Sequence, residues 1–272
     1  MPRRLRAPAA RPAAKMRVRN HDVNAVILFV VSPHIIGIMS IAENVTRVRE
    51  RIVAAAKRVG RDPDSVTLMA VSKTVEPARI FEAYAAGVRV FGENRVQEFQ
   101  EKFTALAALK DARWHLIGHL QTNKARKSVE AFHAVDSLDS LRLAQKLEEA
   151  AVQLNKTLPV LIEINVGGES SKSGVPLDSP ELEDLLRGAA RLERMEIRGL
   201  MAVPPLTENP DAARPYFRLL RDLRDSIAAR RLPRIGMDTL SIGMSHDFEV
   251  AIEEGSTCVR VGTAIFGERP RP

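Results

Sequence analysis

The chain has 272 residues with 41 basic and 34 acidic side chains, and its formal net charge is +7. Most of that excess lies in residues 1–38, which hold seven basic residues and one acidic residue, so residues 39–272 carry a net charge of only +1. The composition of 45% hydrophobic and 28% charged residues excludes disorder for the bulk of the chain, and the near-neutral part disfavours a basic-patch nucleic-acid binder. A single cysteine, Cys258, excludes an internal disulfide and a cysteine metal cluster, and this fits a cytoplasmic location.

Residues 1–38 begin rich in Arg, Pro and Ala and then contain an apolar run at 25–31. This run is far shorter than the roughly 20 residues of a membrane helix, so we expect no contact with a membrane. A basic start before a short apolar run also resembles a secretion signal or transit peptide. We favour an N-terminal extension that is disordered or dispensable, or that is absent from a working protein whose translation starts at Met39.

From residue 40 onward, short apolar runs alternate with longer amphipathic stretches. Ser40 and Glu43 have the spacing of a capping box before a predicted helix at about 41–59, and a turn follows at 61–64. Strands are predicted at 67–72, 89–92, 114–118, 132–136, 160–166, 196–202, 239–243 and 257–261. Helices are predicted between them at about 77–86, 95–109, 122–130, 138–154, 180–192, 210–230 and 247–254.

The apolar run at 160–166 is too continuous for a strand with one solvated face and is typical of a parallel sheet covered on both sides. Eight strand–helix units in about 200 residues predict a single α/β domain at 39–272, a (β/α)8 TIM-type barrel with an additional N-terminal helix. A doubly wound open sheet is the alternative architecture, and no sequence remains for a second domain.

Function in such a barrel gathers at the carboxyl ends of the strands, and Lys73 directly follows the apolar run 68–71. A lysine held at a strand end of low dielectric has a lowered pKa, and its neutral amine can form a Schiff base. The alternative is an ordinary surface lysine at a strand–loop junction.

Two further features favour a ligand at Lys73. The last two strands end in Gly243-Met244-Ser245 and Gly262-Thr263, whose hydroxyls and backbone N–H groups resemble the usual phosphate site of a barrel. Arg260 lies two residues before Gly262 on the same strand face, and an inward arginine needs an acceptor. A lysine, a phosphate site and an inward arginine together suit an aldehyde that carries a ring nitrogen and a phosphate, which is pyridoxal 5'-phosphate.

The sequence is similar to the pyridoxal phosphate homeostasis proteins, the YggS-like family, whose fold resembles the N-terminal domain of alanine racemase. The resemblance covers essentially all of 39–269 and rests on AVSKT (70–74), FGENRVQE (91–98), WHLIGHLQTNK (114–124), INVGGESSKSG (164–174), RGLMAV (198–203), LSIGMSHDFEVAI (240–252) and STCVRVGTAIFGER (256–269). It implies that Lys73 is the Schiff-base lysine and that Ser245, Gly262 and Thr263, beside Met244, hold the phosphate. It also implies that Arg260 faces the ring nitrogen and that Asn94 lines the pocket.

Arg260 bears on catalysis, because an arginine at the ring nitrogen disfavours the proton that makes the ring an electron sink. A racemase also needs a second base, yet both tyrosines, Tyr84 and Tyr216, fall in predicted helices away from the strand ends. We therefore expect a monomer that binds and delivers pyridoxal phosphate, possessing no turnover of its own and serving apo-enzymes as recipients. The alternatives are a racemase or other Schiff-base barrel enzyme, with His119 as the nearest second acid/base, and a nucleic-acid or partner-binding protein that uses the basic tail.

The remaining candidate residues give weaker indications of function. His115 and His119 could suggest a metal pair, but no further ligand cluster accompanies them, so we expect no metal. Lys172 could touch a phosphate or a second ligand, although a solvated loop lysine is the simpler interpretation. Exposed faces are expected for the basic helix start at 124–127 and for the arginines between 218 and 224, and Cys258 is expected to be buried.

Overall fold

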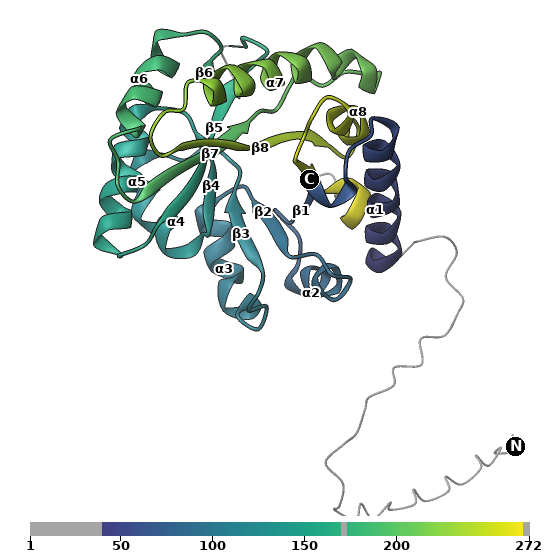
Figure 1. The fold of residues 1–272 in the computed structure, drawn as a ribbon. Coiled ribbons are helices and arrows are strands. Elements are labelled where there is room, and N and C mark those ends of the chain that lie inside the picture. The colour runs from purple at the N-terminus through teal and green to yellow at the C-terminus, as the bar shows by residue number, and fades with distance from the viewer. Residues whose placement is uncertain (1–39, 170–172, 269–272) are drawn as a thin grey trace, which may run out of the picture. The chain divides into compact units, whose positions relative to one another are not determined.

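The computed structural model describes residues 40–169 and 173–268, so the predictions for residues 1–38 and Lys172 fall outside the described residues. Within them, eight parallel strands form a closed barrel, because each strand pairs with the next, β4 pairs with β5, and β9 pairs back with β1 (Figure 1). The strands are β1 (Thr67–Val71), β2 (Val90–Glu93), β3 (Arg113–Leu116), β4 (Ala134–Leu138), β5 (Leu158–Asn165), β7 (Met195–Met201), β8 (Ile235–Met244) and β9 (Cys258–Val261). The predicted barrel is confirmed, and the pairing that closes it excludes the open sheet.

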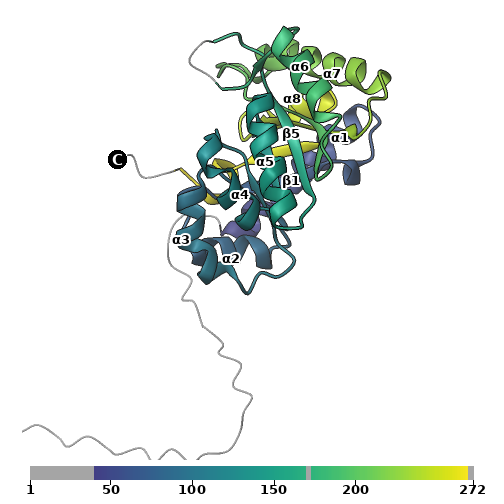
Figure 2. The ribbon, with the colours of Figure 1, turned by 90° about the vertical axis from the view of Figure 1, so that its left-hand side faces the viewer.

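Helices alternate with the strands and form the outer ring. They are α1 (Ile41–Arg58), α2 (Pro77–Ala85), α3 (Val96–Leu106), α4 (Ala125–Ala131), α5 (Leu141–Gln153), α6 (Pro180–Ala189), α7 (Arg214–Ala229), α8 (Phe248–Glu253) and α9 (Thr263–Phe266). Turned by 90°, Figure 2 shows α3, α4, α5 and α6 following one another along one flank, each in contact with the next. Two elements were missed by the sequence analysis: the two-residue strand β6 (Val175–Pro176), which pairs only with β5, and the single-turn helix α9.

Helix α1 begins with the predicted capping box: the Glu43 N–H donates to the Ser40 hydroxyl, and the Glu43 carboxylate accepts from the Ser40 N–H at 2.7 Å. Its apolar stripe, which includes Val45, Val48 and Ile52, is buried. α1 contacts α8, α9 and α2, and Asn44 Nδ2 donates to the Ile265 carbonyl at 2.9 Å. Because α9 is only one turn long, α1 covers the part of the barrel that a full eighth helix would otherwise cover.

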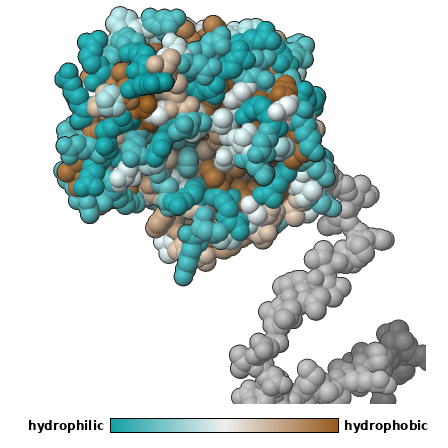
Figure 3. All heavy atoms as spheres, in the orientation of Figure 1, coloured by the Kyte–Doolittle hydropathy of each residue, from teal (hydrophilic) through white to brown (hydrophobic). Residues whose placement is uncertain are grey.

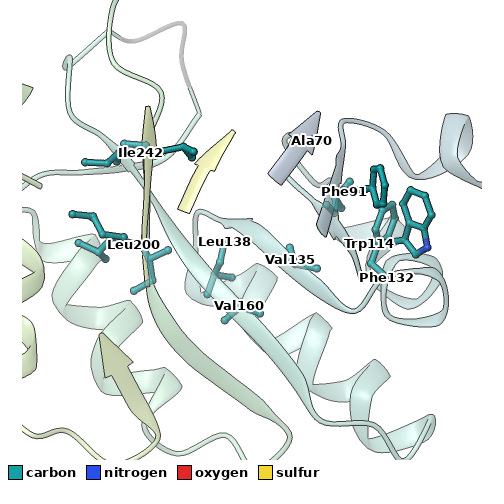
Figure 4. Packing of buried hydrophobic residues seen from close by; sticks show 14 of the residues in the cluster. Ala70, Phe91, Trp114, Phe132, Val135, Leu138, Val160, Leu200 and Ile242 are labelled. Atoms are coloured by element: carbon teal, nitrogen blue, oxygen red, sulfur yellow. The ribbon is translucent and has the colours of Figure 1, made fainter. Parts of the chain in front are cut away.

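The core lies mainly between the strands and the helices. Phe91, Trp114 and Phe132 project from neighbouring strands and the loop before β4 into one aromatic group (Figure 4). The rings of Phe91 and Trp114 stack with centroids 4.9 Å apart, and Phe99 of α3 packs against both Trp114 and Phe132. Each such ring buries a large apolar area, so this group fixes α3 against the sheet.

Side chains of β1 alternate between this core and the barrel interior, as the strand period requires. Ala70 packs in the helix-covered core, whereas Met69 lies inside, beside Gly92 of β2. Met69 is the register partner of Arg260 on β9, and both side chains are buried. Lys73 follows two residues beyond Val71, at the carboxyl end of the barrel.

The face of the molecule in Figure 3 is mainly hydrophilic, with hydrophobic residues in separate patches. None of the described helices is both long enough and apolar enough to cross a membrane.

Candidate functional site

Lys73 stands at the corner of a tight turn that links β1 to α2. The Val75 N–H donates to the Ser72 carbonyl at 3.0 Å and closes the turn around Lys73 and Thr74. Thr74 has a φ of 60°, a left-handed conformation that costs energy for a residue with a branched side chain. The lysine is therefore held at the strand exit predicted for it, on a backbone with little freedom.

A buried polar cluster lies directly behind this turn. The Glu93 carboxylate at the end of β2 accepts from the Ser72 hydroxyl at 2.6 Å and from the Lys102 ammonium of α3 at 2.8 Å. Lys102 also donates to the Ser72 carbonyl at 3.0 Å. The residue that precedes Lys73 is thus bonded through both its side chain and its backbone.

The loops after β8 and β9 are joined by one serine. The Ser245 hydroxyl oxygen accepts from the N–H groups of Gly262 at 3.2 Å and Ala264 at 3.3 Å. The buried Asp247 carboxylate accepts from the Met244 N–H at 2.7 Å and holds the first of these loops. Together the two loops form a cup of backbone N–H groups and hydroxyls, and binding of a phosphate there stays a prediction.

A cavity of about 310 Å³ lies between the β1 exit and the β9 exit, and Lys73, Gly262 and Thr263 all line it. Val71, Arg79 and Glu268 are among the other lining residues. The size is at the lower end of the range of roughly 300–1,000 Å³ that small-molecule pockets occupy. Lys73 and the β9 part of the cup, distant in sequence, therefore share one ligand-sized space, whereas Met244 and Ser245 are not among its lining residues.

Arg260 lies inside the barrel and is only 3% exposed. Its guanidinium donates to the Ser241 hydroxyl at 2.8 Å and to the Ala202 carbonyl at 2.7 Å. Burial lowers the pKa of Arg260, and no carboxylate within the described residues forms an ion pair with it. A carboxylate or a ligand atom was the acceptor expected for this arginine, and the structure instead shows neutral oxygens. Arg260 is not among the residues that line the cavity with Lys73.

The opposite wall of the barrel carries two histidine–carboxylate pairs. His115 Nδ1 lies 3.1 Å from the Asp136 carboxylate, and His119 Nδ1 lies 3.0 Å from that of Asp139. Burial opposes the charge on His115, but Asp136 outweighs it and raises the pKa of the imidazole. His119, the second base expected for an enzyme, has a side chain that is 53% exposed and lies at the rim; His115 is the histidine inside.

Glu163 of β5 belongs to the same wall. Burial raises the pKa of Glu163 to about 7, and the nearby Asp139 adds to this shift, whereas Arg260 and His119 oppose it. Its Oε2 is buried and accepts no hydrogen bond from the part of the chain that the structure describes. The sequence analysis missed this carboxyl; its position in the apolar run of a strand was the available signal.

Asn94 is half-buried at the end of β2, and its side chain lies over Gly118, where a Cβ would come within 2.7 Å of Asn94 Oδ1. It is not among the residues that line the cavity with Lys73. Asn94 is therefore placed at the mouth of the barrel, on the side of β2 and β3.

The remaining predictions concern groups away from this site. Tyr84 and Tyr216 lie in the outer helices α2 and α7, as predicted, and the described residues contain no group of side chains suited to a metal ion. Cys258 is buried, and burial raises the pKa of its thiol to about 12. Of the arginines expected on an exposed face, Arg218 is exposed, whereas Arg221 and Arg224 are partly buried. Arg218 and Arg221 pair with the buried Glu254, as does Arg214.

Comparison with known proteins identifies the class of protein that has this closed barrel with a lysine at the end of its first strand. Residues 40–270 match the protein-family profile described as "Alanine racemase, N-terminal domain". Two solved enzymes share this fold at low identity: the alanine racemase of Clostridium difficile 630 (TM-score 0.62, 15% identity, 84% of this chain and 58% of that one) and the D-threonine aldolase of Filomicrobium marinum (TM-score 0.64, 19%, 85% and 61%).

Relatives with higher sequence identity show the family within this class. The chain is 47% identical over 231 residues to the pyridoxal phosphate homeostasis protein of Aquifex aeolicus (strain VF5), covering 85% of this chain and 99% of the relative. Identity to the protein of the same name from Escherichia coli (strain K12) is 44%, with 84% and 97% covered. The chain belongs to the pyridoxal phosphate homeostasis protein family. PipY of Synechococcus elongatus PCC7942, solved with PLP bound, has a similar fold (TM-score 0.73, 38% identity, 84% of this chain and 100% of PipY).

Proposed function

We propose that this chain binds pyridoxal 5'-phosphate in the cytoplasm and acts in its homeostasis or delivery, without turnover of its own. The family and the PLP-bound PipY structure support the choice of ligand. The observation that carries it to this chain is the cavity shared by Lys73, Gly262 and Thr263. An amine and a cup of N–H groups in one small space suit an aldehyde and a phosphate on one compact ring.

In this proposal, different residues hold different parts of the ligand. Lys73 holds the aldehyde carbon as a Schiff base, and Ser245, Gly262 and Thr263 hold the phosphate, with Met244 and Asn94 bordering the pocket. Ser245 accepts two N–H groups, and its own hydroxyl hydrogen has no acceptor within the described residues, so it is free to donate to a phosphate oxygen. Arg260 donates to the ring nitrogen.

Arg260 also explains the lack of turnover. When bound, pyridoxal phosphate supplies an electrophilic aldehyde and an electron-accepting ring, and the ring accepts electrons best when its nitrogen is protonated. A buried guanidinium at that nitrogen disfavours the proton because like charges repel. The site is therefore suited to holding the cofactor and poorly suited to stabilising carbanions. We expect a monomer that passes the cofactor to apo-enzymes.

Absorbance tests this proposal directly. Purified protein mixed with pyridoxal phosphate should gain a chromophore that Lys73→Ala abolishes, while Lys110→Ala, a change at an exposed lysine, should retain it. A protein that stays colourless, or a chromophore that persists in Lys73→Ala, would overturn the assignment. Deleting residues 1–38 should leave cofactor binding intact, and nucleic-acid binding lost with that deletion would instead support the tail as an interaction segment.

One observation favours the enzyme alternative. The His115–Asp136 pair inside the barrel has the arrangement of an oriented acid/base, which a racemase would need on the second face of its substrate. Incubating the loaded protein with amino acids in deuterium oxide distinguishes the two. Steady incorporation of deuterium at the α-carbon, lost in His115→Gln, would establish turnover; we expect none above the rate of free pyridoxal phosphate.

A further inference from the structure

The backbone that presents Lys73 is fixed from the side opposite the cavity. The Ser72 carbonyl accepts two hydrogen bonds, from the Val75 N–H that closes the turn and from the Lys102 ammonium, both at 3.0 Å. The Ser72 N–H donates to the Gly92 carbonyl at 2.9 Å, and its hydroxyl donates to Glu93. Every polar group of Ser72 is thus bonded, and the peptide between Ser72 and Lys73 cannot rotate without breaking one of these bonds.

The charges involved are buried. The Glu93 side chain is fully buried, that of Lys102 is 13% exposed, and their ion pair spans 2.8 Å. Removing two such charges from water is costly, and well-packed apolar residues often stabilise a fold equally well. Glu93 Oε2 also accepts no hydrogen bond within the described residues, so the pair is not optimised for stability alone. Both members of the pair form hydrogen bonds with Ser72, the residue before Lys73.

We propose that Lys102 and Glu93 are positioning residues that fix the approach of the Lys73 amine and so set how firmly pyridoxal phosphate is retained. This inference rests on the proposed function of Lys73. Thr74, in its left-handed conformation, would relax if the Ser72 carbonyl were released. The turn would then open, and Lys73 would lose its alignment with the cup at Gly262 and Thr263.

The electrostatic effects of Lys102 and Glu93 on the Lys73 nitrogen also oppose each other. Lys102 and Glu93 carry opposite charges, so removing one leaves the other unpaired behind the lysine. An unpaired Glu93 carboxylate favours the protonated form of the lysine nitrogen, and an unpaired Lys102 ammonium disfavours it. The charged side chains facing Lys73 across the cavity, Arg79 and Glu268, and the buried Arg260 are the same in all variants, so their effects cancel in the comparison.

The test uses the full chain loaded with pyridoxal phosphate. Lys102→Met, Glu93→Gln and the double variant are compared with Lys110→Met, a change at an exposed lysine beyond α3. Two quantities are measured: the rate at which an added amine such as methoxyamine removes the cofactor, and the pH midpoint of the chromophore. Lys102→Met should accelerate removal about 10-fold, because a small misplacement of a reacting group has large kinetic effects. The midpoint should rise by about one pH unit in Lys102→Met, fall in Glu93→Gln, and return near the wild-type value in the double variant.

A purely structural role predicts a different result. Variants that lose thermal stability but keep removal rates and midpoints within twofold and 0.2 pH unit, roughly the error of such titrations, would overturn the proposal. If Lys102→Met does not fold, Ser72→Ala removes one bond of Glu93 without burying a lone charge, and it should still accelerate removal. A wild-type protein that binds no pyridoxal phosphate, or a Lys73→Ala variant that keeps the chromophore, would refute the proposed function itself.

Discussion

Met69 and Arg260 are register partners on the first and last strands of the barrel. The pairing places two chain segments side by side at the carboxyl end, where β1 continues to Lys73 and β9 continues to Gly262. The amine and the proposed phosphate cup come from opposite ends of the domain sequence. Their proximity depends on closure of the barrel and not on any local motif.

The proposed contact of Arg260 with the ring nitrogen can be tested with Arg260→Gln. Removing the charge should weaken pyridoxal phosphate binding by roughly 10- to 100-fold, since hydrogen bonds from charged groups contribute about 1.5–3 kcal/mol. The measurement is an equilibrium titration followed by absorbance. Arg198→Gln, at an exposed arginine of β7, should bind as the wild type does. A folded Arg260→Gln variant with unchanged affinity would show that Arg260 does not contribute to cofactor binding.

Substitutions at two glycines of the cup should separate an effect on folding from an effect on cofactor binding. Gly243 has a φ of 90°, and a Cβ there would lie 2.6 Å from the Ala251 Cβ and 2.9 Å from the Phe248 Cα, so Gly243→Ala should unfold the loop that carries Ser245. At Gly262 a Cβ would make ordinary contact with Val71 at 3.5 Å, so Gly262→Ala should fold.

Because the added methyl group of Gly262→Ala enters the cavity between Val71 and Gly262, we expect a melting temperature within a few degrees of wild type and an affinity about 10-fold lower. Calorimetry and cofactor titration measure the two effects. Equal losses of stability in both glycine variants would contradict this assignment.

Glu163 predicts a pH dependence of stability. Its pKa is raised from an ordinary 4.5 to about 7, so between these pH values the folded state holds a proton that the unfolded chain has released. Stability therefore falls as pH rises through this window, by on the order of 2 kcal/mol. Glu163→Gln should stabilise the protein at pH 8 relative to wild type and have little effect at pH 4. Urea unfolding at both pH values measures this, and the exposed Glu101→Gln should show no such difference.

Glu254 predicts the opposite dependence. Burial opposes ionisation of this carboxyl, but Arg214 and Arg218 outweigh it and lower its pKa. Its contribution is therefore complete above its ordinary pKa and is lost as pH falls through the lowered folded value. Glu254→Gln should cost about 2 kcal/mol at pH 7, because it leaves three arginines without their shared acceptor. The exposed Glu50→Gln is the control, and an equally small loss in both variants would show that the cluster adds nothing.

The sequence predicted the barrel well, because its strands are continuous apolar runs and its helices have clear stripes and caps. It also placed Lys73 and Ser245 just beyond strand ends, where the structure has them, because strand ends are readable from residue order alone. Their role in binding a ligand stays a prediction. It did not reveal the partners of Arg260, the link from Ser245 to Gly262, or the contact of Lys102 with Ser72. These depend on the stagger of neighbouring strands and on the helix rotation, which residue type and spacing do not specify.

Helix α1 packs against α8 and α9, the last helices of the barrel, although it is the first of the described helices in the chain. A ribosome-bound chain that has not yet released β9 lacks Arg260, Gly262 and Thr263, and it also lacks α9, one of the helices that α1 contacts. The proposed capture of a reactive aldehyde would thus wait for the synthesis of β9 and the loop that follows it. Since Asn44 and Ile265 are bonded, the ends of the domain are also neighbours, and a permuted chain that joins them with a short linker and opens elsewhere should assemble the same barrel.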